Sequence, residues 1–277
     1  MKSWVWCMVL AAPLWCQKMN PPFQLPDGVE MKKDVVYARP GGRDLHLDLF
    51  LPKTGTGPFP AVVYIHGGGF SKGNKLAFCR QAAYMATQGF VGASIEYRLS
   101  GEAKYPAALD DSRAAVGWLR AHAREYRVSP DRIGAAGGSA GGHLVAMLGT
   151  TGQSGVKAVA AFNPAVDLVS IGKTNPTDEN LVKFLGCSYT DNPKLWAEAT
   201  PLTHVSKDSA AFLFLHGTAD TTVPYQQSVD MMNKLKAAGV SAAIFPAEGA
   251  KHGFFQSPPF FEPAMLRMEA FFRDKLR

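Results

Sequence analysis

One serine of this sequence stands in a run of small residues, GGSAGGH at 137–143, where four glycines and one alanine flank Ser139. Residues 137–141 match the pattern G-x-S-x-G, in which a serine occupies a sharp turn between a strand and a helix. That turn is strained and leaves room only for small neighbours. It would present the Ser139 hydroxyl at a helix N-terminus, where the helix dipole favours developing negative charge. The stretch therefore indicates a nucleophilic serine.

Two other uses of a glycine-rich turn compete with this interpretation. A phosphate-binding loop would read G-x-x-x-x-G-K-[ST], or G-x-G-x-x-G after the first strand. The stretch has no lysine and comes late in the chain, which disfavours phosphate binding. A plain tight turn stays open while this motif is considered alone, because G-x-S-x-G also arises by chance.

A second glycine-rich stretch, HGGGF at 66–70, directly follows the apolar run AVVYI. Attack of a serine on an acyl carbonyl creates an oxyanion, which backbone N–H groups can stabilise. The expected donors are the N–H groups of Gly68, Gly69 and Ala140, the residue after the serine. A merely flexible loop would not explain why the three glycines follow an apolar strand.

A base and an acid for this serine are predicted from the chain order Ser, then Asp or Glu, then His. His252, in GAKHGFF, is the last of seven histidines and is the predicted base. Asp220, in HGTADTTVP, is the predicted acid that orients the imidazole and stabilises the imidazolium. Asp220 could instead cap the next helix, and Asp167 is then the alternative acid. His143, one helical turn past the serine, is interpreted as structural or wall-forming.

These residues must be positioned by strands and helices that alternate along most of the chain. A hairpin is predicted at 34–38 and 44–52, on either side of the turn PGGR. Further strands are predicted at 61–66, 90–97, 131–137, 156–163, 211–217 and 241–247, and helices at 75–88, 107–124, from 139, at 225–238 and from 262. Such alternation predicts an α/β fold with a mostly parallel central sheet and helices on both faces. The candidate residues follow strands, and ligands bind at the carboxyl ends of strands in such sheets.

The length of 277 residues suits one α/β domain, predicted at 21–277, with a lid-like insertion at about 166–205. Lysine and arginine (29) exceed aspartate and glutamate (23), which gives a net charge of +6. This surplus is spread along the chain, so nucleic-acid binding is disfavoured. The cysteines lack the spacing of a metal site, and a disulfide between Cys79 and Cys187 remains open. No feature indicates an oligomeric state.

The N-terminal residues differ in composition from the rest of the sequence. Lys2 precedes an apolar run at 4–15, which is too short to span a bilayer and is typical of a secretory signal. We therefore expect a signal peptide at 1–20, export to the periplasm or the outside, and no membrane span. Lipidation at Cys16 is a lesser alternative, because the bulky tryptophan before it is unlike a lipoprotein signal.

Several stretches together resemble a known family over the chain from about residue 30 to the C-terminus: HGGGF, EYRLS, YPAALDD, DRIGAAGGSAGGH, HGTADTTVP and AKHGFF. They are similar to the α/β-hydrolase fold. More narrowly, they resemble the serine esterases grouped with hormone-sensitive lipase and with bacterial acetylxylan and feruloyl (BD-FAE-type) carbohydrate esterases. By this resemblance Ser139, Asp220 and His252 match the catalytic triad, and the HGGG glycines match the oxyanion loop.

Two departures from the hormone-sensitive-lipase pattern refine what the resemblance implies. Gly138 stands where those relatives often have aspartate, as in many members of the acetylxylan and feruloyl type. Those relatives also have a substantial N-terminal helical cap, which this chain lacks room for, so the lid must come mainly from 166–205. A thin lid implies an open site for an ester on a bulky sugar or aryl acid. Its walls are expected to include Phe70, Trp196 and Phe254, with Phe255 beside them, although such aromatic residues are more often core.

The residues and the resemblance predict an exported serine carboxylic-ester hydrolase that works through an acyl-enzyme and needs no cofactor and no metal. The favoured substrates are acetyl or feruloyl esters of plant polysaccharide, or related small esters. A generic short-chain carboxylesterase or lipase-like enzyme is the alternative. A prolyl-oligopeptidase-type peptidase shares the serine turn, but HGGG favours an esterase. A non-catalytic α/β-hydrolase used as a binding module is disfavoured, because all three triad residues are present.

Overall fold

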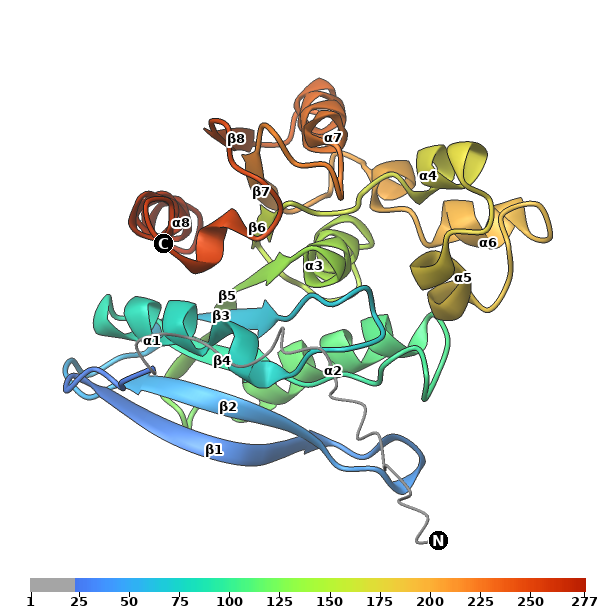
Figure 1. Cartoon of the computed structure of the whole chain (residues 1–277). Helices are drawn as coiled ribbons and strands as arrows, with labels where there is room; N and C mark the ends of the chain where they lie inside the picture. The colour runs from blue at the N-terminus through green and yellow to red at the C-terminus, as the bar shows by residue number, and fades with distance from the viewer. Residues whose placement is uncertain (1–22) are drawn as a thin grey trace, which may run out of the picture.

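The computed structural model describes residues 23–277, so the predicted signal segment at 1–20 and its cysteines lie outside the described residues. The described chain forms an eight-stranded sheet with the order β1-β2-β4-β3-β5-β6-β7-β8 (Figure 1). The strands are β1 Val29–Ala38, β2 Leu45–Pro52, β3 Phe59–Ile65, β4 Val91–Ile95, β5 Val128–Gly138, β6 Ala158–Phe162, β7 Ala211–Gly217 and β8 Ala242–Ala247. Strands β4, β3, β5, β6, β7 and β8 pair in parallel, whereas β1 and β2 form an antiparallel edge. The predicted mostly parallel sheet is confirmed.

Helices cover both faces of this sheet, as predicted (Figure 1). The α-helices are α1 Cys79–Thr87, α2 Ala107–Ala121, α3 Ala140–Thr150, α4 Leu168–Thr174, α5 Glu179–Leu185, α6 Pro193–Glu198, α7 Tyr225–Ala237 and α8 Phe261–Lys275. Short 3₁₀ turns occur at η1 Pro40–Gly42, η2 Lys75–Phe78, η3 Pro201–His204 and η4 Phe254–Gln256. Helices α1 and α8 pack on one face, and α2, α3 and α7 pack on the other.

The central strands are apolar along their whole length because they are buried on both sides. In β3, Val63 and Ile65 point into the core under α2 and α3, whereas Val62 and Tyr64 point into the core under α1 and α8. Successive side chains of a strand alternate between the two faces of a sheet, so a strand covered on both faces must be apolar at every position. This packing accounts for the run AVVYI in the sequence.

The register of the parallel strands brings their carboxyl ends to one edge of the sheet. Ile65 at the end of β3 pairs with Gly137 of β5, and Gly138 pairs with Phe162 at the end of β6. Phe162 in turn pairs with Leu215 of β7. The segments that follow β3, β5, β6, β7 and β8 therefore emerge side by side, and every predicted catalytic residue lies in one of them.

The segment 166–205 departs from strand and helix alternation and contains α4, α5, α6 and η3. Each of its three α-helices begins at a residue whose side chain accepts a hydrogen bond from a backbone N–H group of the first turn, namely Asp167, Asp178 and Asn192. Such caps satisfy N–H groups that have no partner inside the helix. Figure 1 shows these short helices beyond the edge of the sheet, away from α1 and α8.

Other sequence expectations concern groups away from the sheet edge. Cys79 and Cys187 are both free thiols, with Cys79 buried and Cys187 partly exposed. Within residues 23–277, no cluster of three or more metal-ligating side chains occurs, and no helix is long and apolar enough to cross a bilayer.

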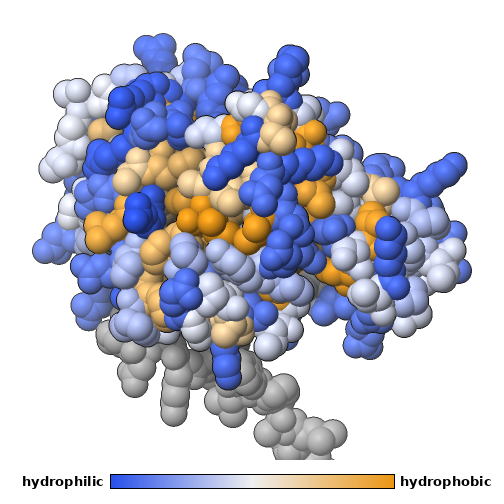
Figure 2. Space-filling view, turned by 90° about the horizontal axis from the view of Figure 1, so that it is seen from above, coloured by the Kyte–Doolittle hydropathy of each residue, from blue (hydrophilic) through white to orange (hydrophobic). Residues whose placement is uncertain are grey.

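Figure 2 shows apolar side chains gathered across the middle of one face, with hydrophilic side chains around them.

Candidate active site

Ser139 lies in the turn that joins β5 to α3, with φ 55° and ψ −120°. Few residues other than glycine adopt a positive φ, so the turn holds this backbone under strain. A Cβ on Gly137 would lie 2.5 Å from the carbonyl oxygen of Gly141, and one on Gly141 would overlap the carbonyl oxygen of Ile65. The glycines of the stretch GGSAGG are therefore required by packing around the serine, as the motif predicts.

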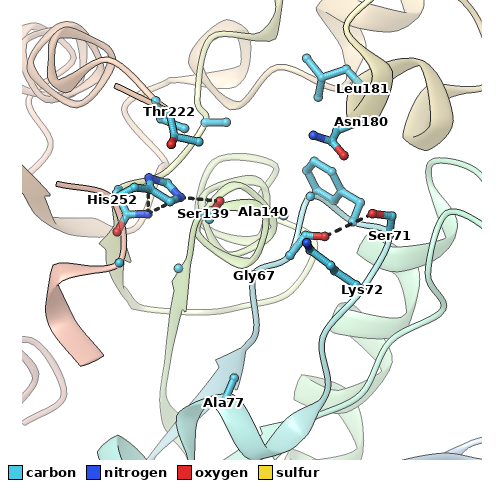
Figure 3. Close-up of a pocket in the computed structure, with 18 of the residues that line it drawn as sticks. Gly67, Ser71, Lys72, Ala77, Ser139, Ala140, Asn180, Leu181, Thr222 and His252 are labelled. Carbon is cyan, nitrogen blue, oxygen red and sulfur yellow. Dashed lines mark hydrogen bonds between the residues drawn. The ribbon is translucent and has the colours of Figure 1, made fainter. Parts of the chain in front are cut away.

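The structure brings the side chains of Ser139, Asp220 and His252 together from three loops. Figure 3 shows Ser139 and His252 facing one another. Nε2 of His252 lies 3.0 Å from Oγ of Ser139, and Nδ1 lies 2.7 Å from Oδ2 of Asp220. A carboxylate only accepts hydrogen bonds, so Nδ1 of His252 carries the hydrogen. Nε2 then has a free lone pair that accepts the hydroxyl hydrogen of Ser139. This arrangement can draw a proton from the serine.

Asp220 is buried, and its two carboxylate oxygens have different partners. Oδ1 accepts the N–H groups of Thr222 (2.8 Å) and Val223 (3.0 Å), and Oδ2 faces His252. Burial alone would raise the pKa of Asp220. Hydrogen bonds from His216, His252 and the N–H of Val223 outweigh burial and hold this pKa well below its ordinary value. Asp220 therefore fixes the turn before α7 and faces the imidazole, but it does not cap α7, which begins at Tyr225 without a side-chain cap.

His216, at the end of β7, is a second histidine beside Asp220 whose contact the sequence did not reveal. Its Nε2 lies 3.0 Å from the carbonyl oxygen of Val223 and 3.3 Å from Oδ2 of Asp220. Both partners only accept hydrogen bonds, so Nε2 carries the hydrogen, and Nδ1 accepts from the hydroxyl of Ser228 at 2.7 Å. His216 thereby helps to orient Asp220.

The remaining sequence candidates lie outside this chain of hydrogen bonds. Asp167, the alternative acid, caps α4 by accepting the N–H of Ser170 at 2.9 Å. His143 is fully buried, and its Nδ1 donates to the carbonyl oxygen of Ala165 at 2.9 Å. Burial lowers the pKa of His143 to about 4, although that hydrogen bond opposes the shift. His143 is therefore a neutral structural residue, as the sequence indicates.

The loop HGGGF lies directly against the serine turn. A Cβ on Gly67 would lie 2.6 Å from the carbonyl oxygen of Gly138 and 3.1 Å from Cβ of Ser139. Gly68 and Gly69 have φ values of 117° and 59°, which glycine adopts without strain. Ala140 is the first residue of α3, so its N–H has no partner inside the helix. These N–H groups are the predicted oxyanion donors.

A cavity of about 660 Å³ opens above Ser139. Figure 3 shows Ser139, Ala140 and His252 on one side of the cavity, with Asn180 and Leu181 across from them. Its polar lining outside the hydrogen-bonded chain consists of Ser71, Lys72, Asn163, Asp178, Asn180, Thr222 and Gln256. Aromatic side chains of Phe70, Phe78 and Phe255 supply much of the apolar lining.

Two of the three predicted aromatic wall residues do not line this cavity. Phe70 does, as expected. The prediction of Trp196 as a wall residue is wrong, because its side chain is fully buried in the insertion. It packs edge-on against Tyr189 and donates its indole N–H to the carbonyl of Cys187. Phe254 is also wrong, because its ring turns to Phe260 in the core beside α8. Its neighbour Phe255 lines the cavity instead.

Asn163 is a cavity residue that the sequence predicts only as the last residue of a strand. It directly follows β6, and its Nδ2 lies 3.1 Å from both ring nitrogens of His252. A polar residue at the carboxyl end of a parallel strand was the available signal, because the other predicted site residues share that position.

Comparison with known proteins gives one family match and several similar chains. A sequence model of the BD-FAE family matches residues 47–235. The probable carboxylic ester hydrolase LipM of Mycobacterium tuberculosis is 30% identical over 76% of this chain and 53% of its own length. The chain spans about half the length of the curated relatives it matches.

Two solved structures share the fold across almost the whole chain. A truncated carbohydrate esterase from gut microbiota has a TM-score of 0.82 and 27% identity, covering 90% of this chain and 97% of that one. The propionate-bound thermophilic esterase Est2 of Thermogutta terrifontis has a TM-score of 0.77 and 30% identity, covering 92% and 96%. The sheet order and these similarities identify the α/β-hydrolase fold.

Proposed function

Because this chain belongs to the BD-FAE family and has the α/β-hydrolase fold, we propose that it is a serine carboxylic-ester hydrolase. The observation that carries the proposal is the hydrogen-bonded chain from Ser139 through His252 to Asp220. The hydrogen bond from Nδ1 of His252 to Asp220 leaves the lone pair of Nε2 in the neutral ring directed at Ser139, as acyl transfer needs. The names of similar proteins, which are esterases, support the same activity.

The proposed reaction has two halves that use the same residues. Oγ of Ser139 bonds to the ester carbonyl carbon while its proton passes to Nε2 of His252, and the carbonyl electron pair moves onto oxygen. The N–H groups of Gly68, Gly69 and Ala140 stabilise that oxyanion. The intermediate collapses, and the leaving alcohol takes the proton from His252. Water then attacks the acyl-serine by the same route, releasing the carboxylic acid and restoring Ser139.

We propose acetyl or feruloyl esters of plant polysaccharide, or related small esters, as substrates. Polar side chains at the cavity, among them Ser71, Lys72 and Asn180, are suited to the hydroxyl groups of a sugar. The carbohydrate esterase among the similar structures supports this choice. A short-chain carboxylesterase is the second candidate, because the similar Est2 structure holds propionate and the lining is largely apolar.

The proposal extends to the organisation of the chain. Residues 21–277 form a single catalytic domain, and the insertion 166–205 acts as its small lid. Ile171, Asp178, Asn180 and Leu181 from the insertion line the cavity, which supports that role. A signal peptide at 1–20 would export the enzyme to the place where polysaccharide esters occur.

The experiment that tests this function compares a series of p-nitrophenyl esters with acetylated xylan and methyl ferulate. We expect hydrolysis of at least one class, and its loss in Ser139→Ala at unchanged fold. Full activity in Ser139→Ala would overturn the assignment of the nucleophile. Absence of cleavage by the folded wild-type protein, together with retained binding of an ester ligand, would favour the binding-module alternative.

A further inference from the structure

Asn163 is held in a strained position beneath the cavity. It directly follows β6, has a φ of 36° and is 1% exposed. Its backbone N–H donates to the carbonyl oxygen of Leu215 in β7 at 2.8 Å, which fixes the main chain against the neighbouring strand. Strained non-glycine residues persist only where the surroundings impose the conformation, and they are concentrated at functional sites.

The side chain of Asn163 is directed at the imidazole of His252. Nδ2 lies 3.1 Å from Nδ1 and 3.1 Å from Nε2 of that ring. The in-plane direction of each ring nitrogen is already used, by Asp220 and by Ser139. The carboxamide therefore contacts the face of the ring and is not a third in-plane hydrogen-bond partner. Its Oδ1 is buried and has no hydrogen-bond partner within residues 23–277.

His252 needs support from its neighbours because its own loop supplies little. It lies in the irregular segment between β8 and η4, followed by Gly253 with φ 80°, and its side chain is 24% exposed. A base that passes a proton from the serine to the leaving alcohol must keep its ring in one orientation. A buried carboxamide against one face restricts rotation of that ring.

We propose that Asn163 is a positioning residue that holds the imidazole of His252 between Ser139 and Asp220. The inference rests on the proposed function, because it takes His252 as the base. An unpaired buried carbonyl oxygen costs about 1–3 kcal/mol. An apolar side chain that served packing alone would not have this cost. The unpaired oxygen therefore supports a role for the carboxamide against the ring.

Removal of the side chain tests the positioning role. Asn163→Gly keeps a residue that adopts positive φ and deletes the carboxamide, so the fold is retained. We expect kcat to fall about 10²-fold, the effect of small misplacement of a catalytic group, with KM nearly unchanged. An unchanged kcat in a variant with a wild-type unfolding midpoint overturns the proposal. A fall that appears only in KM does so as well.

The outcomes separate this inference from the proposed function. If Ser139→Ala abolishes hydrolysis while the variants at 163 behave as wild type, the inference alone fails. If Ser139→Ala remains active, the proposed function fails first. Should Asn163→Gly not fold, the kcat and KM of Asn163→Ala, which also removes the carboxamide, decide in its place.

Discussion

Two walls of the cavity differ in how the chain builds them. The sheet-edge wall consists of the loop 67–70 with Ser139, Asn163 and His252, each directly after a strand or in the loop that follows one. The insertion wall consists of Ile171, Asp178, Asn180 and Leu181, carried by α4, α5 and the turn between them. The first wall is fixed by strand register, positive φ angles and hydrogen bonds between its own residues. The second consists of short helices with side-chain caps.

The reacting groups lie on the sheet-edge wall, whereas the insertion wall supplies other side chains of the cavity lining. Helices α4, α5 and α6 have 7, 7 and 6 residues, too few to be stable alone, so packing must hold them. One contact between the walls is made by Phe184 of α5, whose ring stacks on Phe70 of the glycine loop at 3.8 Å between centroids. The ring of His143 is nearly perpendicular to both of these rings. The insertion wall can therefore vary its exposed residues without moving the base or the nucleophile.

The largest expected effect contrasts one histidine from each region. His252→Ala should lower kcat by about 10⁶-fold, as loss of the base does in serine hydrolases. His204→Ala removes a ring in η3 of the insertion. Within residues 23–277, the one side-chain hydrogen bond of His204 is to the carbonyl oxygen of Glu198. It should leave kcat within about twofold of wild type. Comparable losses in both variants would contradict the separation of the walls.

A smaller effect is expected where the two walls touch. Gly69 has a φ of 59°, and a Cβ there would lie 2.8 Å from Oδ1 of Asn180. Gly69→Ala should displace an N–H donor and lower kcat about 10²–10³-fold. Adding Asn180→Ala relieves the overlap but not the strain, so it should restore only part of the rate. Gly101→Ala, with open space around it and an ordinary φ, is the control; equal kinetics in all three variants would contradict the account.

The smallest effect concerns stability and pH through His143. The pKa of His143 is about 4 in the folded protein and 6.5 ordinarily, so between these values the unfolded chain binds a proton that the folded chain does not. The fold therefore loses stability as pH falls from 6.5 to 4, by up to about 3 kcal/mol from this residue. Urea unfolding at pH 7 and 4.5 should show a smaller decrease for His143→Gln than for wild type. His204→Gln is the control for loss of a histidine, and identical decreases in wild type and His143→Gln would exclude this coupling.

The sequence predicts the sheet-edge wall far better than the insertion wall. Alternation and apolar runs locate the strands, and the end of a strand fixes where the next residue must lie. The sequence alone therefore predicts Ser139, Asp220 and His252 as site residues. The contact of Asn163 with the base depends on how the segments after β6 and β8 meet, which neither stretch of sequence shows alone. Trp196 lies in a six-residue helix, which is too short for a sequence pattern to show whether an aromatic side chain faces the cavity or the core. Tertiary packing buries it in the core.

The most direct test of the central claim is to locate the reactive residue chemically. A fluorophosphonate should form a covalent adduct with the serine whose proton His252 accepts, and mass spectrometry of the digested protein identifies the modified position. The account predicts an adduct on Ser139 in the wild-type protein and its loss in His252→Ala. An adduct on another residue, or undiminished labelling of Ser139 without His252, would contradict it.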